Sequence, residues 1–260
     1  PTSEFRIVKD RQSLSQHETF LPAVQKTCKA GYDGKGIYKI ANKSDIASAF
    51  DEPSVLEKWI DFDKEISVLI ARSVDGKTAI YPTVEMMFHP QKNLVEFLLC
   101  PANIPEDINK KAQAIALRIV NEINLVGLLA VEMFVDKKGQ VLVNEIAPRV
   151  HNSGHHTIEG SLTSQFEQHM RAVLGLPLGP VDLTLPSVMV NILGDEGCDG
   201  PARYEGVQEA MSLGGVFIHL YGKAITKPFR KMGHATVVHK DIKEALSIAQ
   251  KVKALIKVMA

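Results

Sequence analysis

A predicted β-hairpin in the middle of the chain constrains the fold more strongly than any other segment. Residues 127–135 and 141–145 are apolar segments that flank a short turn at residues 137–139, Lys-Lys-Gly. Two apolar segments joined by a short turn that contains glycine are typical of a β-hairpin. Pairing of the two strands would bring Glu132, in the first strand, close to Glu145, at the end of the second.

Two carboxylates in apolar strands require a compensating partner. A carboxylate is costly to remove from water, and two of them at one place repel each other. A cation between Glu132 and Glu145 would offset both charges, and ligation by oxygen alone suits Mg²⁺ bound together with a nucleotide. The alternative is that both carboxylates lie on the solvated side of the hairpin. The metal interpretation makes Glu132 and Glu145 the predicted ligands.

A glycine-rich segment, residues 31–36 (Gly-Tyr-Asp-Gly-Lys-Gly), separates two earlier predicted strands at residues 21–26 and 37–40. Three glycines in six positions allow the backbone to approach a ligand closely and to point N–H groups at it. Lys26 at the end of the preceding strand could counter phosphate charge. The pattern is neither a P-loop, because no GK[ST] follows, nor a dinucleotide fingerprint, because no helix follows. A simple hairpin turn with solvated lysines is the alternative.

Two further segments concentrate groups that bind anions. The sequence after Glu145 is rich in donors: Arg149 offers a planar fork for an oxyanion, and His151 and Asn152 add neutral donors. The histidines there do not predict a zinc site, because no cysteine or acidic residue completes a tetrahedral set. Near the C-terminus, a loop punctuated by glycine and proline carries Lys223, Lys227, Arg230 and Lys231, which could form one wall of a phosphate site.

The remaining periodicity predicts an α+β protein. Strands are also expected at residues 5–8, 55–59, 65–71, 79–83, 187–193, 215–221 and 234–238. Helices are expected at residues 46–50 (capped by Ser44), 105–123, 161–174 and 242–258. The helix at residues 105–123 is expected to bury Ile108, Ala112, Ile115, Ile119 and Ile123. The helix at residues 161–174 is expected to place Phe166, Met170 and Val173 on one side. The helix at residues 242–258 is expected to direct Leu246, Ala249, Val252 and Ile256 inward. The segment 175–180, rich in glycine and proline, divides the chain into domains at residues 1–180 and 181–260.

The bulk composition excludes several classes of function. Thirty basic residues balance thirty acidic ones, so no net charge favours nucleic acid or an anionic membrane. No apolar run approaches the roughly 20 residues that cross a bilayer. Cys28, Cys100 and Cys198 lack metal-type spacing and are expected to be reduced and buried, as in a cytoplasmic protein.

In their order along the chain, these motifs resemble the ATP-grasp superfamily and, within it, the N5-carboxyaminoimidazole ribonucleotide synthase family. The resemblance covers nearly the whole chain. It rests on Lys26, the glycine segment 31–36, residues 57–60 with Phe62 and Glu65, the specific segment 144–155, and the shorter segments 164–169 and 231–234. It implies an ATP-grasp fold followed by a small C-terminal α/β domain.

The resemblance also implies roles for individual residues. Magnesium would be held by Glu132 and Glu145. ATP would be bound by Lys26, Gly31, Tyr32, Gly34, Lys35, Gly36, Glu57, Lys58, Trp59, Ile60, Glu65, His89 and Asn144. The catalytic groups would be Asp33, Arg149, His151 and Asn152. Bicarbonate and the aminoimidazole would be surrounded by Tyr32, Asp33, Arg149, His151, Asn152 and Ser153, with Lys223 and Arg230 on the 5′-phosphate.

The implied activity is the ATP- and bicarbonate-dependent carboxylation of 5-aminoimidazole ribonucleotide in purine biosynthesis, through carboxyphosphate, by a cytoplasmic homodimer. Two alternatives stay open: a formate-dependent glycinamide ribonucleotide transformylase, and a nucleotide-binding fragment without activity. The chain does not begin with methionine, and members of the family carry an N-terminal nucleotide-fold domain. An N-terminal portion is therefore expected to be missing.

Overall fold

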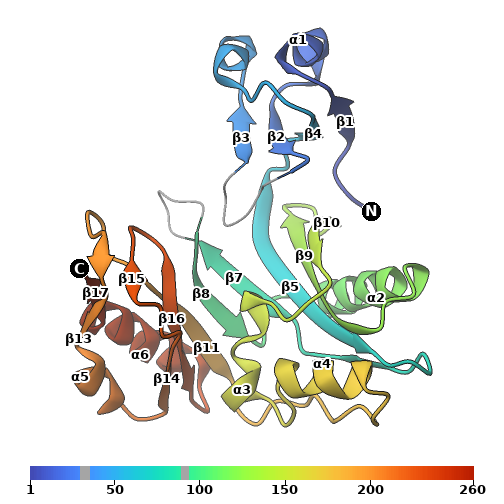
Figure 1. Cartoon of the computed structure of the whole chain (residues 1–260). Helices are drawn as coiled ribbons and strands as arrows, with labels where there is room; N and C mark the ends of the chain where they lie inside the picture. The colour runs from blue at the N-terminus through green and yellow to red at the C-terminus, as the bar shows by residue number, and fades with distance from the viewer. Residues whose placement is uncertain (30–35, 89–93) are drawn as a thin grey trace.

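The computed structural model describes residues 1–29, 36–88 and 94–260 of the chain. Within these residues the strands form a four-stranded sheet, a nine-stranded sheet and two short strand pairs. Figure 1 shows the small sheet, in blue, standing above the large one. The mixture of antiparallel sheets with separate helices confirms the predicted α+β class.

The small sheet has the strand order β1-β4-β2-β3 and is antiparallel throughout. Its strands are β1 (Phe5–Val8), β2 (Ala23–Thr27), β3 (Ile37–Ile40) and β4 (Ser54–Lys58). One face packs on α1 (Arg11–Leu14) and the 3-10 helices η1 (Ser15–Phe20) and η2 (Lys43–Ser48). The predicted β2–β3 hairpin is confirmed. The cap of η2 is Asn42 rather than Ser44, because the Asn42 side chain accepts the Ser44 N–H.

The large sheet has the order β10-β9-β5-β7-β8-β11-β16-β14, with β6 beside β5. Its bounds are β5 (Phe62–Arg72), β6 (Thr78–Ile80), β7 (Val84–Phe88), β8 (Val95–Cys100), β9 (Gly127–Asp136), β10 (Val141–Ala147), β11 (Ser187–Leu193), β14 (Val216–Leu220) and β16 (Lys231–Val238). The predicted β9–β10 hairpin is confirmed. Its turn is fixed by Gly139, at φ 73°, and by the Asp136 carboxylate, which accepts the N–H groups of Lys138 and Gln140.

Alternation along β5 and β9 gives the centre of the large sheet two different faces. One face is apolar and packs on α2 (Glu106–Glu122), with Ile66, Val68 and Val131 in this core. The other face has a buried apolar cluster at one end, around Leu69. Towards the small sheet this second face carries Glu65, Ser67 and Glu132 instead, and Ser67 pairs with Glu132 in the register. Polar side chains thus gather between the two sheets.

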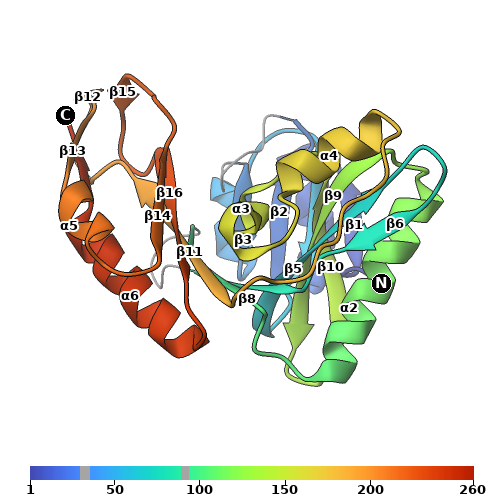
Figure 2. The ribbon, with the colours of Figure 1, turned by 90° about the horizontal axis from the view of Figure 1, so that it is seen from below.

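The C-terminal region extends the same sheet, because β11 pairs with β8 on one side and with β16 on the other. Figure 2 shows α6 and α5 covering one side of these strands. The remaining elements are α3 (Thr157–Gly160), η3 (Asn152–Gly154), α4 (Gln165–Val173), α5 (Val207–Met211), α6 (Ile242–Leu255), β12 (Gly200–Pro201), β13 (Arg203–Glu205), β15 (Ile225–Thr226) and β17 (Lys257–Met259). The domain boundary between residues 180 and 181 stays a prediction.

Two strands, β7 and β8, were not predicted, and several predicted bounds were wrong. The strand expected at residues 79–83 ends at Ile80, because Pro82 cannot donate a ladder hydrogen bond. The helix expected from residue 161 begins at Gln165, since the Ser164 hydroxyl caps it by accepting the Glu167 N–H. The last helix ends at Leu255, after which β17 pairs with β13.

The inward faces of the helices also differ from the expectation. In α2 the fully or nearly fully buried side chains are Ile108, Ala112, Ala116 and Val120, whereas Ile123 is 48% exposed. In α4 the predicted apolar side is exposed, and the buried side carries two glutamines and Ala172. In α6, Leu246 is only partly buried. The three cysteines form no disulfide within the described residues, but only Cys100 is buried; Cys28 is exposed and Cys198 intermediate.

No helix among the described residues is both long and apolar enough to cross a membrane.

A row of stacked rings joins the α3–α4 region to the C-terminal strands. His155 lies between Phe166 and His234, with ring centroids 5.7 and 4.7 Å away, and His234 stacks on His219 at 4.6 Å. The Glu159 carboxylate lies 2.6 Å from Nε2 of His219. Burial, with the nearby charges of Lys231 and His219, lowers the pKa of His155 to about 4.

Two other histidines are held neutral for the same main reason. Burial, with the neighbouring His155 and His219, lowers the pKa of His234 to about 3. Burial likewise lowers the pKa of the fully buried His156 to about 4. All three rings take up protons more readily in the unfolded chain than in the folded one.

We therefore predict that stability falls as the pH drops below about 6.5, where histidines of the unfolded chain become protonated. The loss continues to about pH 4 for His155 and His156 and to about pH 3 for His234. It amounts to up to about 1.4 kcal/mol per pH unit for each such histidine. Urea unfolding at pH 7 and pH 5 measures it. His234→Phe, which keeps a ring in the stack, should reduce the difference between the two pH values. An unchanged difference would contradict this explanation.

Candidate active site

A β-bulge in the β9–β10 hairpin brings Glu132 and Glu145 together. Val143 pairs with Met133, but the next pair along the ladder is Glu145 with Glu132, so Asn144 is the extra residue. Without the bulge, Glu145 would lie opposite Val131 and would point into the core against α2. The one-residue shift instead places both carboxylates on the polar face of the sheet.

Glu132, Glu145 and His151 form a cluster whose potential ligand atoms all lie within 4.8 Å of one another. Nδ1 of His151 is 3.6 Å from Oε1 of Glu132, and both side chains are largely buried. Burial and the charge of Glu145 raise the pKa of Glu132 to about 7, although Lys231, Lys26 and Arg149 act in the opposite direction. Glu132 is therefore a buried carboxylate with a second carboxylate beside it, and both features disfavour its ionised form.

A chain of polar contacts connects this cluster to the small sheet. Lys26 Nζ, on β2, lies 2.8 Å from the Glu57 carboxylate and donates to Oδ1 of the bulge residue Asn144 at 2.8 Å. Nδ2 of Asn144 donates to Glu65 at 3.3 Å. Glu65 is only 7% exposed, and burial with the charges of Glu132 and Glu145 raises its pKa to about 8. Lys26 thus reaches across from one sheet to the acidic cluster of the other.

The other residues predicted to bind the nucleotide have different surroundings, and some of them lie outside the described residues. Trp59 is 37% exposed and has Lys39 Nζ 3.7 Å above its ring. The Lys58 ammonium donates to the carbonyls of Phe20 and Leu21, within the small-sheet part of the chain. Ile60 is partly buried, and Gly36 has φ 75°. The predicted residues Gly31, Tyr32, Asp33, Gly34, Lys35 and His89 lie outside the described residues.

The segment after β10 supplies the predicted catalytic side chains. Arg149 is exposed, and its charge acts on Glu132. Oδ1 of Asn152 is buried and has no hydrogen-bond partner among the described residues. The Ser153 hydroxyl is 2.9 Å from both the Ser67 hydroxyl and Nδ1 of His151. Ser153 therefore supports His151 in the structure, and its contact with a substrate stays a prediction.

The C-terminal basic loop lies between β14 and β16. Lys223 Nζ donates to the Lys231 carbonyl at 2.5 Å, and Arg230 donates to the Ile225 carbonyl at 2.8 Å. Lys231 is near enough for its charge to lower the pKa values of Glu132 and His155. The sheet thus brings the C-terminal part of the chain to the acidic cluster.

Two residues that lie near the cluster, Lys231 and Ser67, were assigned no role there from the sequence. Lys231 was noted in the basic loop but was assigned no contact with the carboxylates. Ser67 is a lone hydroxyl within the apolar sequence of β5, Ile66-Ser67-Val68. That interruption was the signal that could have revealed it, because a buried hydroxyl needs a polar partner.

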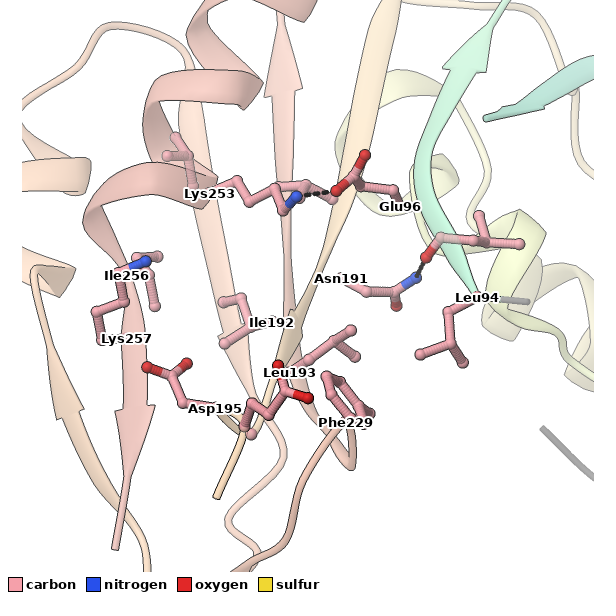
Figure 3. A pocket seen from close by; sticks show the side chains of 15 residues that line it. Leu94, Glu96, Asn191, Ile192, Leu193, Asp195, Phe229, Lys253, Ile256 and Lys257 are labelled. Carbon is pink, nitrogen blue, oxygen red and sulfur yellow. Dashed lines mark hydrogen bonds and ion pairs between the residues drawn. The ribbon is translucent and has the colours of Figure 1, made fainter. Parts of the chain in front are cut away.

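A separate cavity of about 430 Å³ lies among β8, β11, the end of α6 and β17. Figure 3 shows Lys253 paired with Glu96 at one wall and Asn191 bonded to the β8 backbone. None of the predicted site residues lines this cavity. It is therefore distinct from the candidate active site.

Comparisons with known proteins agree with this geometry. Residues 1–166 match the model of the ATP-grasp domain, and residues 187–248 match the phosphoribosylaminoimidazole carboxylase C-terminal domain. N5-carboxyaminoimidazole ribonucleotide synthase of Bacillus subtilis is 45% identical over 238 residues, which are 89% of this chain and 60% of that protein. The chain thus spans less than two thirds of the length of this relative.

Two solved structures show the same fold. The Thermotoga maritima N5-carboxyaminoimidazole ribonucleotide synthetase is 42% identical with a TM-score of 0.88, and the match covers 100% of this chain and 68% of that one. The Aspergillus clavatus synthase, solved with ADP and 5-aminoimidazole ribonucleotide, is 32% identical with a TM-score of 0.85, and the match covers 97% of this chain and 68% of that one. This chain belongs to the N5-carboxyaminoimidazole ribonucleotide synthase family of ATP-grasp proteins.

Proposed function

We propose that this chain carries the active site of an ATP-dependent carboxylase that converts 5-aminoimidazole ribonucleotide and bicarbonate to N5-carboxyaminoimidazole ribonucleotide. The observation that carries the proposal is the bulged hairpin. It holds Glu132 and Glu145 together and faces Lys26 of the small sheet. The names of the relatives, and the ADP and ribonucleotide bound to one of them, support the same substrates.

The acidic cluster fits a magnesium ion. Two carboxylates in the cluster offer the oxygen ligands that Mg²⁺ prefers. Burial, with the charge of Glu145 beside it, raises the pKa of Glu132, so a cation bound there would stabilise the ionised form. We assign Glu132 and Glu145 as the metal ligands. His151 offers nitrogen, which Mg²⁺ binds less readily than oxygen, so we assign His151 to the reaction. Bound magnesium would neutralise charge on the transferred phosphoryl group.

The nucleotide is proposed to lie between the two sheets. Lys26 would counter phosphate charge next to the metal site, at the position where it now contacts Glu57 and Asn144. Residues 57–60 and Gly36 would border the nucleotide from the small sheet. Since the Lys58 ammonium is bonded to the carbonyls of Phe20 and Leu21, its contribution would come from its backbone. Glu65 is proposed to accept hydrogen bonds from the ribose.

The chemistry proceeds in two transfers. An oxygen of bicarbonate attacks the γ-phosphorus of ATP; the bond from that phosphorus to the ADP oxygen breaks, which gives ADP and carboxyphosphate. The exocyclic amine of the imidazole then attacks the carboxyl carbon, phosphate leaves with the bonding electron pair, and the nitrogen loses a proton. Carboxyphosphate is easily hydrolysed, so the site must exclude water during the second step.

The loop after β10 is proposed to hold the reacting groups. Arg149 would bind the bicarbonate oxyanion, and Asn152, with an unpartnered buried Oδ1 among the described residues, would bind the amine. His151 lies between them in sequence and contacts Ser153. Lys223 and Arg230 would bind the 5′-phosphate from the C-terminal loop. Asp33, outside the described residues, is proposed as the group that takes the proton. We also propose a cytoplasmic homodimer.

The first prediction concerns the substrates. With Mg²⁺, ATP and bicarbonate, ADP release by this chain should increase when aminoimidazole ribonucleotide is added. The Bacillus relative assayed in parallel is the positive control. ATP binding without stimulation would identify a nucleotide-binding module instead, and stimulation by glycinamide ribonucleotide with formate would identify the alternative ligase.

The second prediction concerns the metal. Glu145→Gln should weaken Mg²⁺-dependent ADP binding about tenfold or more, because one ligand charge is lost. ADP binding without Mg²⁺ should change little. Isothermal titration with and without Mg²⁺ measures both, and Glu122→Gln, at the exposed end of α2, is the matched control. Equal effects with and without Mg²⁺ would exclude Glu145 as a ligand.

A further inference from the structure

Among the described residues, three fully buried glutamine side chains share one arrangement. Each forms hydrogen bonds with both the backbone N–H and the backbone C=O of a single residue that is distant in the sequence. In each case Oε1 accepts the N–H and Nε2 donates to the C=O of the same residue. The pairs are Gln25 with Phe50, Gln165 with His151, and Gln168 with Gly179. A buried carboxamide that satisfies a backbone donor and acceptor together fixes that residue more firmly than a single bond would.

The Gln165 clamp acts on the predicted catalytic loop. Its Oε1 is 2.9 Å from the His151 nitrogen, and its Nε2 is 2.8 Å from the His151 oxygen. Nε2 also lies 2.9 Å from Nδ1 of His155. The loop approaches Gln165 so closely that a Cβ on Gly154 would stand 2.4 Å from Oε1. Glycine is therefore required at residue 154 for the clamp to close.

The ring of His151 is held as well as its backbone. Nδ1 is 2.9 Å from the Ser153 hydroxyl, which is in turn 2.9 Å from the Ser67 hydroxyl on β5. With its backbone fixed by Gln165 and its ring fixed by Ser153, His151 keeps Nδ1 3.6 Å from Oε1 of Glu132. Loss of either support would let the ring move relative to the metal site.

We propose that Gln165 is a positioning residue for catalysis: it orients His151 against Glu132 by clamping the His151 backbone from α4. This inference rests on the proposed function, since it assigns His151 to the reaction. Gln165 itself would touch no substrate, because its carboxamide is buried and already bound to the loop. Its effect on the reaction would pass through His151.

The same helix offers a matched control. Gln168, also fully buried, makes the same two hydrogen bonds to Gly179 at 2.8 Å each. Gly179 belongs to the connection before β11, and none of the predicted site residues lies in that connection. Replacement of either glutamine by methionine removes its two hydrogen bonds to the backbone at similar volume, but only Gln165→Met frees the catalytic loop. Gln165→Met also removes the contact with His155.

The test measures both structure and turnover in this chain. Amide hydrogen exchange should become faster at His151 in Gln165→Met and at Gly179 in Gln168→Met. Gln165→Met should lower kcat for ribonucleotide-dependent ADP release by roughly tenfold to hundredfold, with KM for ATP nearly unchanged. Gln168→Met should leave both constants close to the wild-type values. If Gln165→Met does not fold, Gln165→Glu keeps the shape and one acceptor and should lower kcat in the same way.

The outcomes separate the two proposals. Unchanged kcat in Gln165→Met, or equal losses of kcat in the two methionine variants, would overturn the positioning role. Unchanged exchange at His151 in Gln165→Met would overturn the clamp itself. If the wild-type chain shows no ribonucleotide-dependent ADP release, the proposed function has failed, and the exchange measurement still decides whether Gln165 holds His151.

Discussion

The mutual repulsion of Glu132 and Glu145 is the constraint on which the rest of the site depends. One extra residue, Asn144, turns both carboxylates to the same face of the sheet, and burial of Glu132 makes their proximity costly. The compensating charges come from three separate parts of the chain. Lys26 reaches from the small sheet, Arg149 from the following loop and Lys231 from the C-terminal strands. Charges from three parts of the chain thus act on Glu132.

Polar side chains, rather than apolar ones, hold the loop beside this pair. The inward face of α4 carries Gln165 and Gln168, and each binds both backbone groups of a loop residue. With a purely apolar helix face, those loop N–H and C=O groups would be buried without hydrogen-bond partners. The free-energy cost of two such unsatisfied groups exceeds the gain from burying a leucine side chain in place of each glutamine. The apolar side of α4, with Phe166 and Met170, is accordingly partly exposed.

These features explain how far the sequence could predict the structure. Alternation and the short turn predicted the β9–β10 hairpin and the proximity of Glu132 and Glu145, whereas their direct pairing depends on the bulge at Asn144. The bulge could not be predicted, because the spacing of apolar residues does not show which strand carries an extra residue. Periodicity also indicated the wrong inward side of α4, since it assumes that buried means apolar. β7 and β8 were missed, and the helix start at Gln165 depended on the capping bond of Ser164.

The most direct test of this account is to locate the metal. Anomalous scattering from a crystal grown with Mn²⁺ in place of Mg²⁺, together with ADP, would place the ion without reference to activity. The account predicts a peak bridged by the carboxylates of Glu132 and Glu145, with Lys26 beside the nucleotide phosphates. A peak away from both carboxylates, or no peak with ADP bound, would contradict the assignment of Glu132 and Glu145 as the metal ligands.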